Sequence, residues 1–367
     1  MSRSGPVGVA VVGAGVISTQ YLRNLAGFPD VQVVGIADLD VPRARATAEE
    51  YGVPVAGDLD TVLALPEVEL VVNLTIPAAH AAVARAALEA GKHVYGEKPL
   101  ALDPVEGEKL LAEAASRGLR VGNAPDTFLG AGLQSALRAI ASGAIGAPVA
   151  ANTAVMNPGP ERWHPSPEFL FQHGAGPLFD LGPYYLTALV ALLGPAARVA
   201  ATARQGRAER VIGSGPRAGT AFTVEVPTHV TALLDFAGGA SASTTFSFDS
   251  ALPRTQFEVT GTEGTLEIPD PNTFGGVLRV RGTADEDWRE LPVTGTEAGR
   301  GIGVLDMARA LRADRAHRAS GALAQHVLDA MAAITDSAAA GEFRSVDSPC
   351  TAPEPLPADW APEEATL

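Results

Sequence analysis

The tripeptide Glu97-Lys98-Pro99 carries the side chains of this sequence that are best suited to chemistry. It directly follows a short apolar run, residues 93–95, that closes a series of strand-like and helix-like segments. In a doubly wound parallel sheet, the carboxyl ends of the strands face the crevice where a dinucleotide binds. A lysine held at that edge by a proline is placed to touch a reacting substrate. This position predicts that the chain is an enzyme.

Oxidation of a secondary alcohol is a reaction that such a lysine can assist. The hydroxyl proton must leave while hydride leaves the carbon, so the site needs a base and a cation or donor for the developing alkoxide. We expect Lys98 to stabilise the alkoxide; the alternative is a solvated surface charge. Glu97 can orient Lys98 or contact hydroxyl groups of the cofactor or substrate, and its structural alternative is a simple salt bridge to Lys98.

A glycine-rich turn near the amino terminus predicts a dinucleotide site. Gly13 and Gly15 follow an apolar strand-like run and precede a helical segment. The first glycine permits the tight turn, the second lets the pyrophosphate approach the backbone, and the helix N-terminus attracts its charge. Ser18 replaces a third glycine whose main role is packing. Val16 and Ile17, at the start of the helix, are also expected to contact the cofactor.

Asp38 ends the second strand-like run and indicates which dinucleotide binds. Its carboxylate can accept hydrogen bonds from both hydroxyls of the adenosine ribose, and it would repel a 2′-phosphate. The next residue is Leu39, not an Arg or Ser that would bind such a phosphate. We therefore expect NAD, with NADP disfavoured. The structural alternative for Asp38 is a helix N-cap, a role that Asp40 can fill better.

Residues 1–124 alternate short apolar runs with amphipathic segments, which is typical of a parallel sheet covered by helices on both faces. The strand-like runs are residues 7–12, 31–37, 70–74 and 93–95. The helical segments are residues 17–25, 42–51, 80–90 and 104–117. We expect these residues to form one dinucleotide-binding domain.

Residues 125–347 show a different order and predict a second domain for substrate binding and oligomerisation. Their strand-like runs, which favour a mostly antiparallel sheet, are residues 149–155, 228–236, 240–248, 255–260 and 265–268. Their helical segments are residues 132–142, 183–193, 304–311 and 323–339. Residues 348–367 have four prolines within 349–357 and no basic side chain, so we expect a disordered tail.

Composition excludes several classes of function. The chain has 367 residues and a formal net charge of -15, which disfavours a nucleic-acid surface. Its single cysteine, Cys350, allows neither a disulfide framework nor a CxxC metal or redox pair. The amino terminus lacks a signal-peptide pattern, and no run reaches the ~18 continuous apolar residues of a membrane span. We expect a cytoplasmic protein with a small-molecule substrate, bound to neither nucleic acid nor membrane.

Several segments, in order along residues 7–340, resemble the motifs of the glucose-fructose oxidoreductase and inositol dehydrogenase family, called Gfo/Idh/MocA. They are Gly13-Ala14-Gly15, Asp38, residues 75–80 (Thr-Ile-Pro-Ala-Ala-His), Glu97-Lys98-Pro99 and residues 174–184, which end in Asp180-Leu-Gly-Pro-Tyr184. The resemblance implies an N-terminal Rossmann domain and a C-terminal α+β domain with a large open sheet, with nicotinamide and a polyhydroxylated substrate meeting between them.

The resemblance also implies roles for individual residues. Lys98 would contact the reacting hydroxyl, and the bond before Pro99 would be cis. Thr75 and Pro77 would bind the cofactor, and His80 would cap or line the cofactor side. No second ligand stands at metal-binding spacing from His80, so we expect no metal site.

The sequence departs from the family pattern at Tyr184, where many members carry a catalytic histidine and others carry a tyrosine. A phenol, with a pKa of ~10, needs a neighbouring cation to act as a base near neutrality, and Lys98 could provide it. We expect Tyr184 to transfer the proton. The alternative is a packed aromatic residue, a role that Tyr185 could equally take. Asp180 could bind a substrate hydroxyl or position Lys98, or simply cap a helix.

Two further segments bear on the substrate. Residues 123–128 lack the Arg-Phe pair of many relatives, which puts an anionic substrate in doubt. Residues 161–165 are expected to form a loop over the pocket. There, Trp163 offers a flat apolar face to a pyranose ring and His164 offers a hydrogen bond, with simple packing as the alternative.

The sequence thus predicts an NAD-dependent oxidoreductase that acts on a secondary hydroxyl of a sugar, sugar derivative or cyclitol. We expect a homo-oligomer, a dimer or tetramer, because an open sheet face needs cover. One alternative is an enzyme that retains its cofactor and uses transient oxidation for epimerisation, elimination or glycoside cleavage. Another is a non-catalytic dinucleotide-sensing protein, which intact Lys98, Asp180 and Tyr184 disfavour.

Overall fold

The computed structural model describes residues 4–367, which divide into two compact units. The first contains the chain up to Ala131, Gly295–Leu328 and Pro353–Leu367; the second contains Gly132–Thr294 and Asp329–Ala352. The expected boundaries at residues 124 and 347 therefore differ from those in the structure. The physical reason is that helix α8 (Ile302–Ala313) packs against β6 (Val121–Asn123) of the first unit. Periodicity does not reveal which of two domains a helix near the carboxyl end of the chain packs against.

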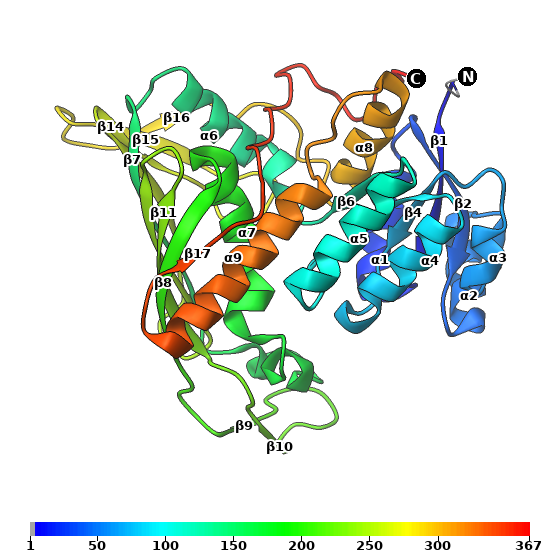
Figure 1. The fold of residues 1–367 in the computed structure, drawn as a ribbon, viewed down its shortest axis with the longest axis horizontal. Coiled ribbons are helices and arrows are strands. Elements are labelled where there is room, and N and C mark those ends of the chain that lie inside the picture. Colours follow the sequence, from blue (N-terminus) through cyan, green and yellow to red (C-terminus); the bar gives the residue numbers. More distant parts are fainter. Residues whose placement is uncertain (1–3) are drawn as a thin grey trace. The chain divides into compact units, whose positions relative to one another are not determined.

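The first unit is built on a parallel sheet of six strands in the order β3-β2-β1-β4-β5-β6. Figure 1 labels β1, β2, β4 and β6 of this sheet. The strands are β1 (Val7–Val12), β2 (Val31–Ala37), β3 (Val55–Gly57), β4 (Leu70–Asn73), β5 (His93–Gly96) and β6 (Val121–Asn123). Every residue of β1 is buried, as expected for a strand covered on both faces. The strand order reverses between β1 and β4, so a ligand crevice is expected at their carboxyl ends.

Helices cover this sheet, and all but the short α3 (Leu59–Leu63) were predicted from periodicity. They are α1 (Val16–Leu25), α2 (Val41–Tyr51), α3 (Leu59–Leu63), α4 (His80–Glu89) and α5 (Pro104–Ser116), with short 3₁₀ turns at Pro77–Ala79 and Thr127–Leu129. Asp40, not Asp38, is the N-cap of α2, and its side chain accepts from the Arg43 amide at 3.3 Å. The peptide bond before Pro99 is cis, as the family resemblance implies.

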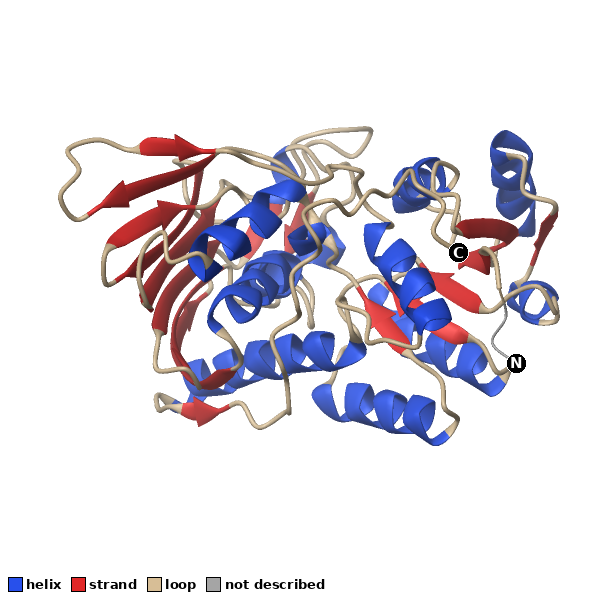
Figure 2. Ribbon diagram, turned by 90° about the horizontal axis from the view of Figure 1, so that it is seen from above, coloured by secondary structure: helices blue, strands red, loops and turns tan. Residues whose placement is uncertain are grey.

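The second unit contains a nine-stranded sheet in the order β16-β15-β14-β13-β7-β12-β11-β8-β17. Its strands are β7 (Pro148–Met156), β8 (Ala196–Arg204), β11 (His229–Phe236), β12 (Ser241–Ser247), β13 (Arg254–Gly261), β14 (Gly264–Glu267), β15 (Leu278–Gly282), β16 (Arg289–Leu291) and β17 (Arg344–Ser345). Only the β7–β12 pair is parallel within this sheet, so the predicted mostly antiparallel sheet is confirmed. Figure 2 shows its strands in red.

The helices associated with the second unit are α6 (Ala131–Ala141), α7 (Gly176–Leu193) and part of α9 (Gly321–Ala340). Helix α7 packs against β7, β11 and β12. Among residues 4–367 it is the one helix long and apolar enough to cross a membrane by composition, yet 83% of it is buried in the protein, which is typical of a core helix. It begins at Gly176 and not at residue 183 as predicted. Pro183 therefore lies inside the helix and does not mark its start.

Residues 353–367 belong to the first unit and are hydrogen-bonded within it, which corrects the prediction of a disordered tail for this part of residues 348–367. Buried Asp30 accepts from the Thr366 amide at 2.9 Å and from the Leu367 amide at 3.1 Å. Arg309 on α8 donates to Asp30 at 2.7 Å and to the carbonyl oxygens of Ala361 and Glu364. Composition could not reveal this attachment, because it depends on Asp30 and Arg309, which are remote in sequence.

We expect Asp30→Asn to lower the free energy of unfolding by about 3–5 kcal/mol, because Arg309 would lose its buried counterion. Burial alone would raise the pKa of Asp30, but hydrogen bonds from Thr366 and Arg309 lower it below its usual value. A carboxyl group with a lowered pKa stabilises the fold above its unfolded-state pKa of about 4, and this contribution is lost as the pH falls through the folded-state pKa.

Urea unfolding at pH 7 and pH 3 checks this expectation. The difference between wild type and Asp30→Asn should shrink at the lower pH. Asp314→Asn is the matched control, since the side chain of Asp314 is 96% exposed and its pair with Arg120 should contribute less than about 1 kcal/mol. Equal losses from the two substitutions would contradict the expectation.

Candidate active site

The glycine-rich turn leaves the amino end of α1 open. Gly13 has φ +101°, and a Cβ there would lie 2.7 Å from the Leu74 carbonyl oxygen, so a side chain is excluded. A Cβ on Gly15 would meet nothing within 4 Å, and the side chain of Val16 is 93% exposed. Ser18 is buried and donates to the Gly15 carbonyl at 2.6 Å, which suits the packing role expected of it. The helix end therefore offers free space to an anionic group.

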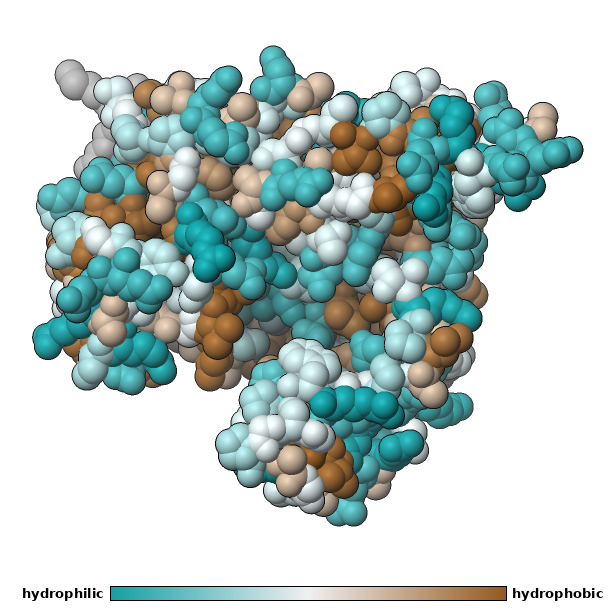
Figure 3. Space-filling model, turned by 180° about the vertical axis from the view of Figure 1, so that it is seen from behind, coloured by the Kyte–Doolittle hydropathy of each residue, from teal (hydrophilic) through white to brown (hydrophobic). Residues whose placement is uncertain are grey.

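A cavity of about 350 Å³ lies beside this turn at the carboxyl edge of the sheet. It is lined by Val12, Gly13, Gly15, Ala37, Asp38, Leu39, Arg43, Leu59, Leu74, Thr75, Ile76, Ala79 and Val83. On the face of the molecule drawn in Figure 3, hydrophobic residues (brown) reach the surface in several separate groups. In the cavity, Leu39 and Ile76 are strongly exposed, which suits walls that a flat apolar ring would cover.

Asp38 lies in the wall of this cavity, and it has a partner that the sequence reasoning missed. Arg43 donates to both carboxylate oxygens, through Nη2 at 2.6 Å and through Nε at 3.2 Å. The amides of Ala14 and Asp40 also donate to it. Burial would raise the pKa of Asp38, but these hydrogen bonds lower it. The sequence feature that could have indicated this pair is the position of Arg43 in the first turn of α2, five residues after Asp38.

His80, which was expected to cap or line the cofactor side, is not among the residues that line this cavity. It is 3% exposed, and its Nδ1 lies 2.7 Å from the Pro99 carbonyl oxygen. Its Nε2 lies 3.0 Å from the carbonyl oxygen of Thr75. Both ring nitrogens therefore face backbone acceptors. His80 joins the loop that lines the cavity to the segment that follows Lys98, which is a positioning role.

Glu97 and Lys98 directly follow β5. The carboxylate of Glu97 is 9% exposed and accepts from the Tyr21 hydroxyl at 2.8 Å and from the Lys98 amide at 3.0 Å. Burial, followed by the charge of Glu97, raises the pKa of Tyr21 well above its usual value, so Tyr21 remains a donor. The carboxylate thus fixes the backbone of the half-buried Lys98.

Arg300 and Asp126 complete a buried polar cluster that sequence reasoning did not find. Arg300 Nη1 lies 4.0 Å from Glu97 Oε1, so a remote segment places a cation near the Glu-Lys-Pro motif. Asp126 is fully buried and accepts from the amides of Gly301 and Gly303. Burial raises the pKa of Asp126 to about 6, although Arg300 and these amides act to lower it.

The second unit carries the other predicted catalytic residues, Asp180 and Tyr184, one helical turn apart on α7. This i, i+4 spacing puts them on one face of the helix. Because α7 begins at Gly176, Asp180 does not cap it. Tyr184 is 6% exposed, whereas Tyr185 is completely buried, donates to Asp270 at 3.3 Å and stacks on Phe257. Tyr185 is therefore packed in the core, and Tyr184 beside it is also buried.

Trp163 and His164 lie on the surface of the second unit. The Trp163 side chain is 69% exposed, and its ring centroid lies 5.5 Å from that of His164 in an edge-to-face arrangement. His164 makes a similar contact with Phe169 at 5.4 Å. Nδ1 of His164 accepts from the Ser166 amide at 3.0 Å, so the neutral ring carries its proton on Nε2 and can donate a hydrogen bond there.

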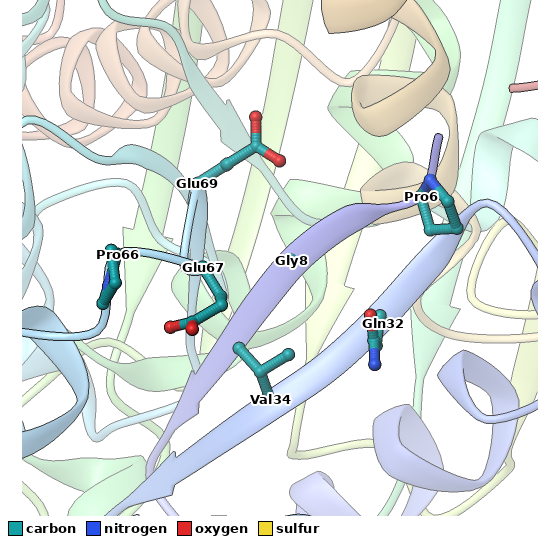
Figure 4. A pocket seen from close by; sticks show the side chains of 7 residues that line it. All are labelled: Pro6, Gly8, Gln32, Val34, Pro66, Glu67 and Glu69. Carbon is teal, nitrogen blue, oxygen red and sulfur yellow. The ribbon is translucent and has the colours of Figure 1, made fainter. Parts of the chain in front are cut away.

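A second hollow of about 350 Å³ lies at the amino ends of β1 and β2. Figure 4 shows the residues that line it: Pro6, Gly8, Gln32, Val34, Pro66, Glu67 and Glu69. Glu69 is paired with Arg312 at 2.6 Å. This hollow is at the edge of the sheet opposite the glycine turn, and its charged lining would repel a phosphate. The candidate active site is therefore at the carboxyl edge.

Comparison with known proteins finds matches over most of the chain. Residues 7–124 match the GFO_IDH_MocA model, "Oxidoreductase family, NAD-binding Rossmann fold", and residues 133–267 match the GFO/IDH/MocA C-terminal domain. Trans-1,2-dihydrobenzene-1,2-diol dehydrogenase from Oryctolagus cuniculus is 30% identical, over 71% of this chain and 75% of the relative. Inositol 2-dehydrogenase from Salmonella paratyphi B is 33% identical, over 30% of this chain and 34% of the relative.

Solved structures share the fold. An NAD binding oxidoreductase from Klebsiella pneumoniae has a TM-score of 0.80 and 24% identity, covering 93% of this chain and 99% of the other. Levoglucosan dehydrogenase in complex with NADH and levoglucosan has a TM-score of 0.80 and 23% identity, covering 93% and 100%. At these identities the likeness establishes the fold alone.

We expect His80→Leu to lower the free energy of unfolding by about 1–3 kcal/mol, because the carbonyl group to which the imidazole N–H donates would lose its partner. NADH affinity should also fall, since Thr75 lines the cavity. Urea unfolding and a titration of NADH fluorescence measure the two effects. His173→Leu replaces an exposed histidine and should change neither. Unchanged stability and affinity in His80→Leu would contradict the positioning role.

Proposed function

The chain belongs to the Gfo/Idh/MocA family of oxidoreductases, and we propose that it is an NAD-dependent dehydrogenase acting on a secondary hydroxyl of a sugar, sugar derivative or cyclitol. One observation carries this proposal. The cavity beside the open end of α1 holds a carboxylate, Asp38, in the same sheet edge from which Lys98 follows β5. A dinucleotide site and a cation suited to alkoxide chemistry thus belong to one edge.

The residues that line the cavity fit NAD. Leu39 and Ile76 would cover the adenine, and Asp38 would accept from the ribose hydroxyls. The turn at Gly13 and Gly15 would receive the pyrophosphate at the N-terminus of α1, with Val16 and Ile17 beside it. Bound NAD would supply the acceptor for hydride. Thr75, Pro77 and Glu97 are the further residues that we propose on the cofactor side.

Lys98, Tyr184 and Asp180 are the proposed catalytic residues. Lys98 would donate to the substrate oxygen and stabilise the charge that develops there. Tyr184 would act as the base that accepts the proton of the reacting hydroxyl. Asp180, on the same face of α7 as Tyr184, would bind a neighbouring substrate hydroxyl and restrict how the ring turns.

A ring-shaped alcohol is the substrate class that the second unit supports best. The exposed ring of Trp163 could stack on the C–H face of a pyranose or cyclitol, and Nε2–H of His164 could donate to a hydroxyl. The names of the relatives point the same way, since they include dehydrogenases of a cyclic diol and of inositol. Levoglucosan is bound in a structure that shares the fold.

We propose that the enzyme is a cytoplasmic homo-oligomer. One face of the nine-stranded sheet carries exposed side chains such as Leu233, which is 54% exposed on β11, a strand with neighbours on both sides. A second copy of the chain could cover such a face. Light scattering of the purified protein would measure the copy number.

Cofactor choice is a testable consequence of the Asp38–Arg43 pair. Wild type should bind NAD more tightly than NADP, because Asp38 repels a 2′-phosphate and holds Arg43. Asp38→Ala should narrow or reverse this preference, since it removes the repulsion and releases a guanidinium that can bind phosphate. Titrations of both cofactors measure the ratio. The control is the double variant Asp38→Ala/Arg43→Ala, which should lose the gain in NADP affinity. If the double variant binds NADP as tightly as Asp38→Ala does, Arg43 does not bind the 2′-phosphate.

The proposed function is tested by NADH absorbance during incubation with NAD and cyclic polyols, including levoglucosan and myo-inositol. Absorbance should grow with substrate turnover; a constant signal from bound cofactor during turnover would instead indicate chemistry without net oxidation. Lys98→Ala and Tyr184→Phe should each lower kcat by roughly 10²-fold or more while NADH binding persists.

Tyr185→Phe is the matched control for Tyr184→Phe, because it removes the hydroxyl of the adjacent tyrosine. It should lower stability by about 1 kcal/mol through loss of the hydrogen bond to Asp270, with kcat retained. If Tyr184→Phe remains active and His164→Ala does not, the base is not Tyr184.

A further inference from the structure

A small hairpin of the second unit stands outside the nine-stranded sheet. Strands β9 (Glu209–Val211) and β10 (Ala221–Thr223) pair only with each other among the described residues. The neighbouring segment, residues 159–171, is here called the aromatic loop because it carries Trp163, His164 and Phe169. Two 3₁₀ turns, Pro160–Arg162 and Glu168–Phe171, lie within this loop.

Arg210 on β9 connects the hairpin to the aromatic loop. Its side chain is only 3% exposed, and Nη1 donates to Glu161 Oε1 at 2.6 Å. Nη2 donates to the Phe248 carbonyl at 3.0 Å and to the carboxylate of Asp249, just beyond β12. The guanidinium also lies over the ring of Phe171, 5.0 Å from its centroid. One buried cation therefore binds both ends of the loop and the edge of the main sheet.

Other contacts hold the loop near the same two places, and an ion pair of Arg217 with Glu168 at 2.5 Å holds it between them. The Gly213 amide donates to the Glu161 carbonyl at 2.7 Å, and the Glu225 amide donates to the Phe171 carbonyl at 2.9 Å. Below them is a separate small apolar core formed by Leu170, Phe171, Val224 and Phe248. The loop is thus fixed before Trp163 and on both sides of Phe169, while the side chains of Trp163 and Phe169 remain exposed.

The charge cluster leaves little tolerance for change. A Cβ on Gly159, which has φ +107°, would lie 2.1 Å from Glu161 Oε2 and 2.4 Å from Arg210 Nη1. Glu161 is 6% exposed, so without Arg210 its carboxylate would be buried beside Asp249 with no cation between them. Two like charges in that environment would separate or draw in water, and the loop would move.

We propose that Arg210 is a positioning residue that determines substrate specificity: it fixes the aromatic loop so that Trp163, His164 and Phe169 form a rigid receiving face for the ring of the substrate. This inference rests on the proposed function. The face combines exposed apolar rings with one N–H donor, so it suits a ring with a C–H face and hydroxyl groups at its edge. Its rigidity removes the ordering entropy that a mobile loop would lose on binding.

The test compares Arg210→Met and Arg210→Lys with Arg198→Met, which removes an exposed arginine on β8. Hydrogen exchange of the full-length variants reports the loop directly and needs no substrate. We expect residues 159–172 to exchange at least about tenfold faster in Arg210→Met, with β7 and β11 unchanged. Arg210→Lys keeps the charge and should give a smaller increase, and Arg198→Met should give none.

Kinetics then separate positioning from general stability. With levoglucosan or myo-inositol as the varied substrate, Arg210→Met should raise KM about tenfold or more with kcat changed less than about threefold, because uniform ring binding is lost. NADH affinity should not change. Unaltered exchange of the loop, or an increase spread evenly over the whole unit, would overturn the inference.

Trp163→Ala distinguishes failure of the positioning role of Arg210 from failure of the proposed dehydrogenase function. If Arg210→Met loosens the loop and raises KM as Trp163→Ala does, the inference is supported. If Trp163→Ala leaves KM unchanged with substrates that are turned over, the loop does not receive the ring, and the specificity role of Arg210 is overturned even where the loop is loosened. Unaltered exchange in Arg210→Met overturns the inference while leaving the dehydrogenase assignment intact.

Discussion

The carboxylate of Glu97 is the constraint on which the first unit's site depends. It accepts a hydrogen bond from Tyr21 on α1 and another from the backbone of Lys98. The helix whose amino end faces the expected pyrophosphate is therefore attached to the lysine proposed to act on the substrate. A buried carboxylate needs such partners, because an unpaired charge there would be strongly unfavourable. The position of Lys98 thus depends on α1 as well as on its own strand.

Side chains that bind backbone carbonyl groups extend the same constraint. His80 contacts the carbonyls of Thr75 and Pro99, and Asn123 donates to those of Gly96 and Glu97. Loops at the carboxyl edge of a sheet have few ladder hydrogen bonds of their own, so they need partners of this kind. The edge is therefore held in place before any ligand arrives, which favours tight and selective binding.

Much of this could be predicted from the sequence, and the parts that could not share a physical cause. The strands at residues 7–12 and 31–37 were predicted with their observed bounds because buried parallel strands are continuous apolar runs. Strands β9 and β10 have three residues each, too few for a periodic signal. Arg300 and Arg210 were missed because a charged side chain in sequence does not reveal whether folding buries it against a remote carboxylate, whereas Arg43 is half exposed and binds a carboxylate only five positions away. Composition likewise could not show that Arg309 binds the segment after residue 353.

The first unit is assembled from both ends of the chain, which affects the order of events during synthesis. Helix α8 covers β6, and the segment bound by Asp30 is translated after the whole of the second unit. When the ribosome has completed residue 131, the six strands exist but lack these partners, and the nascent unit exposes apolar surface until the second unit has been made. Cotranslational folding of this chain should therefore finish with its amino-terminal unit, in the reverse of the usual N-to-C order.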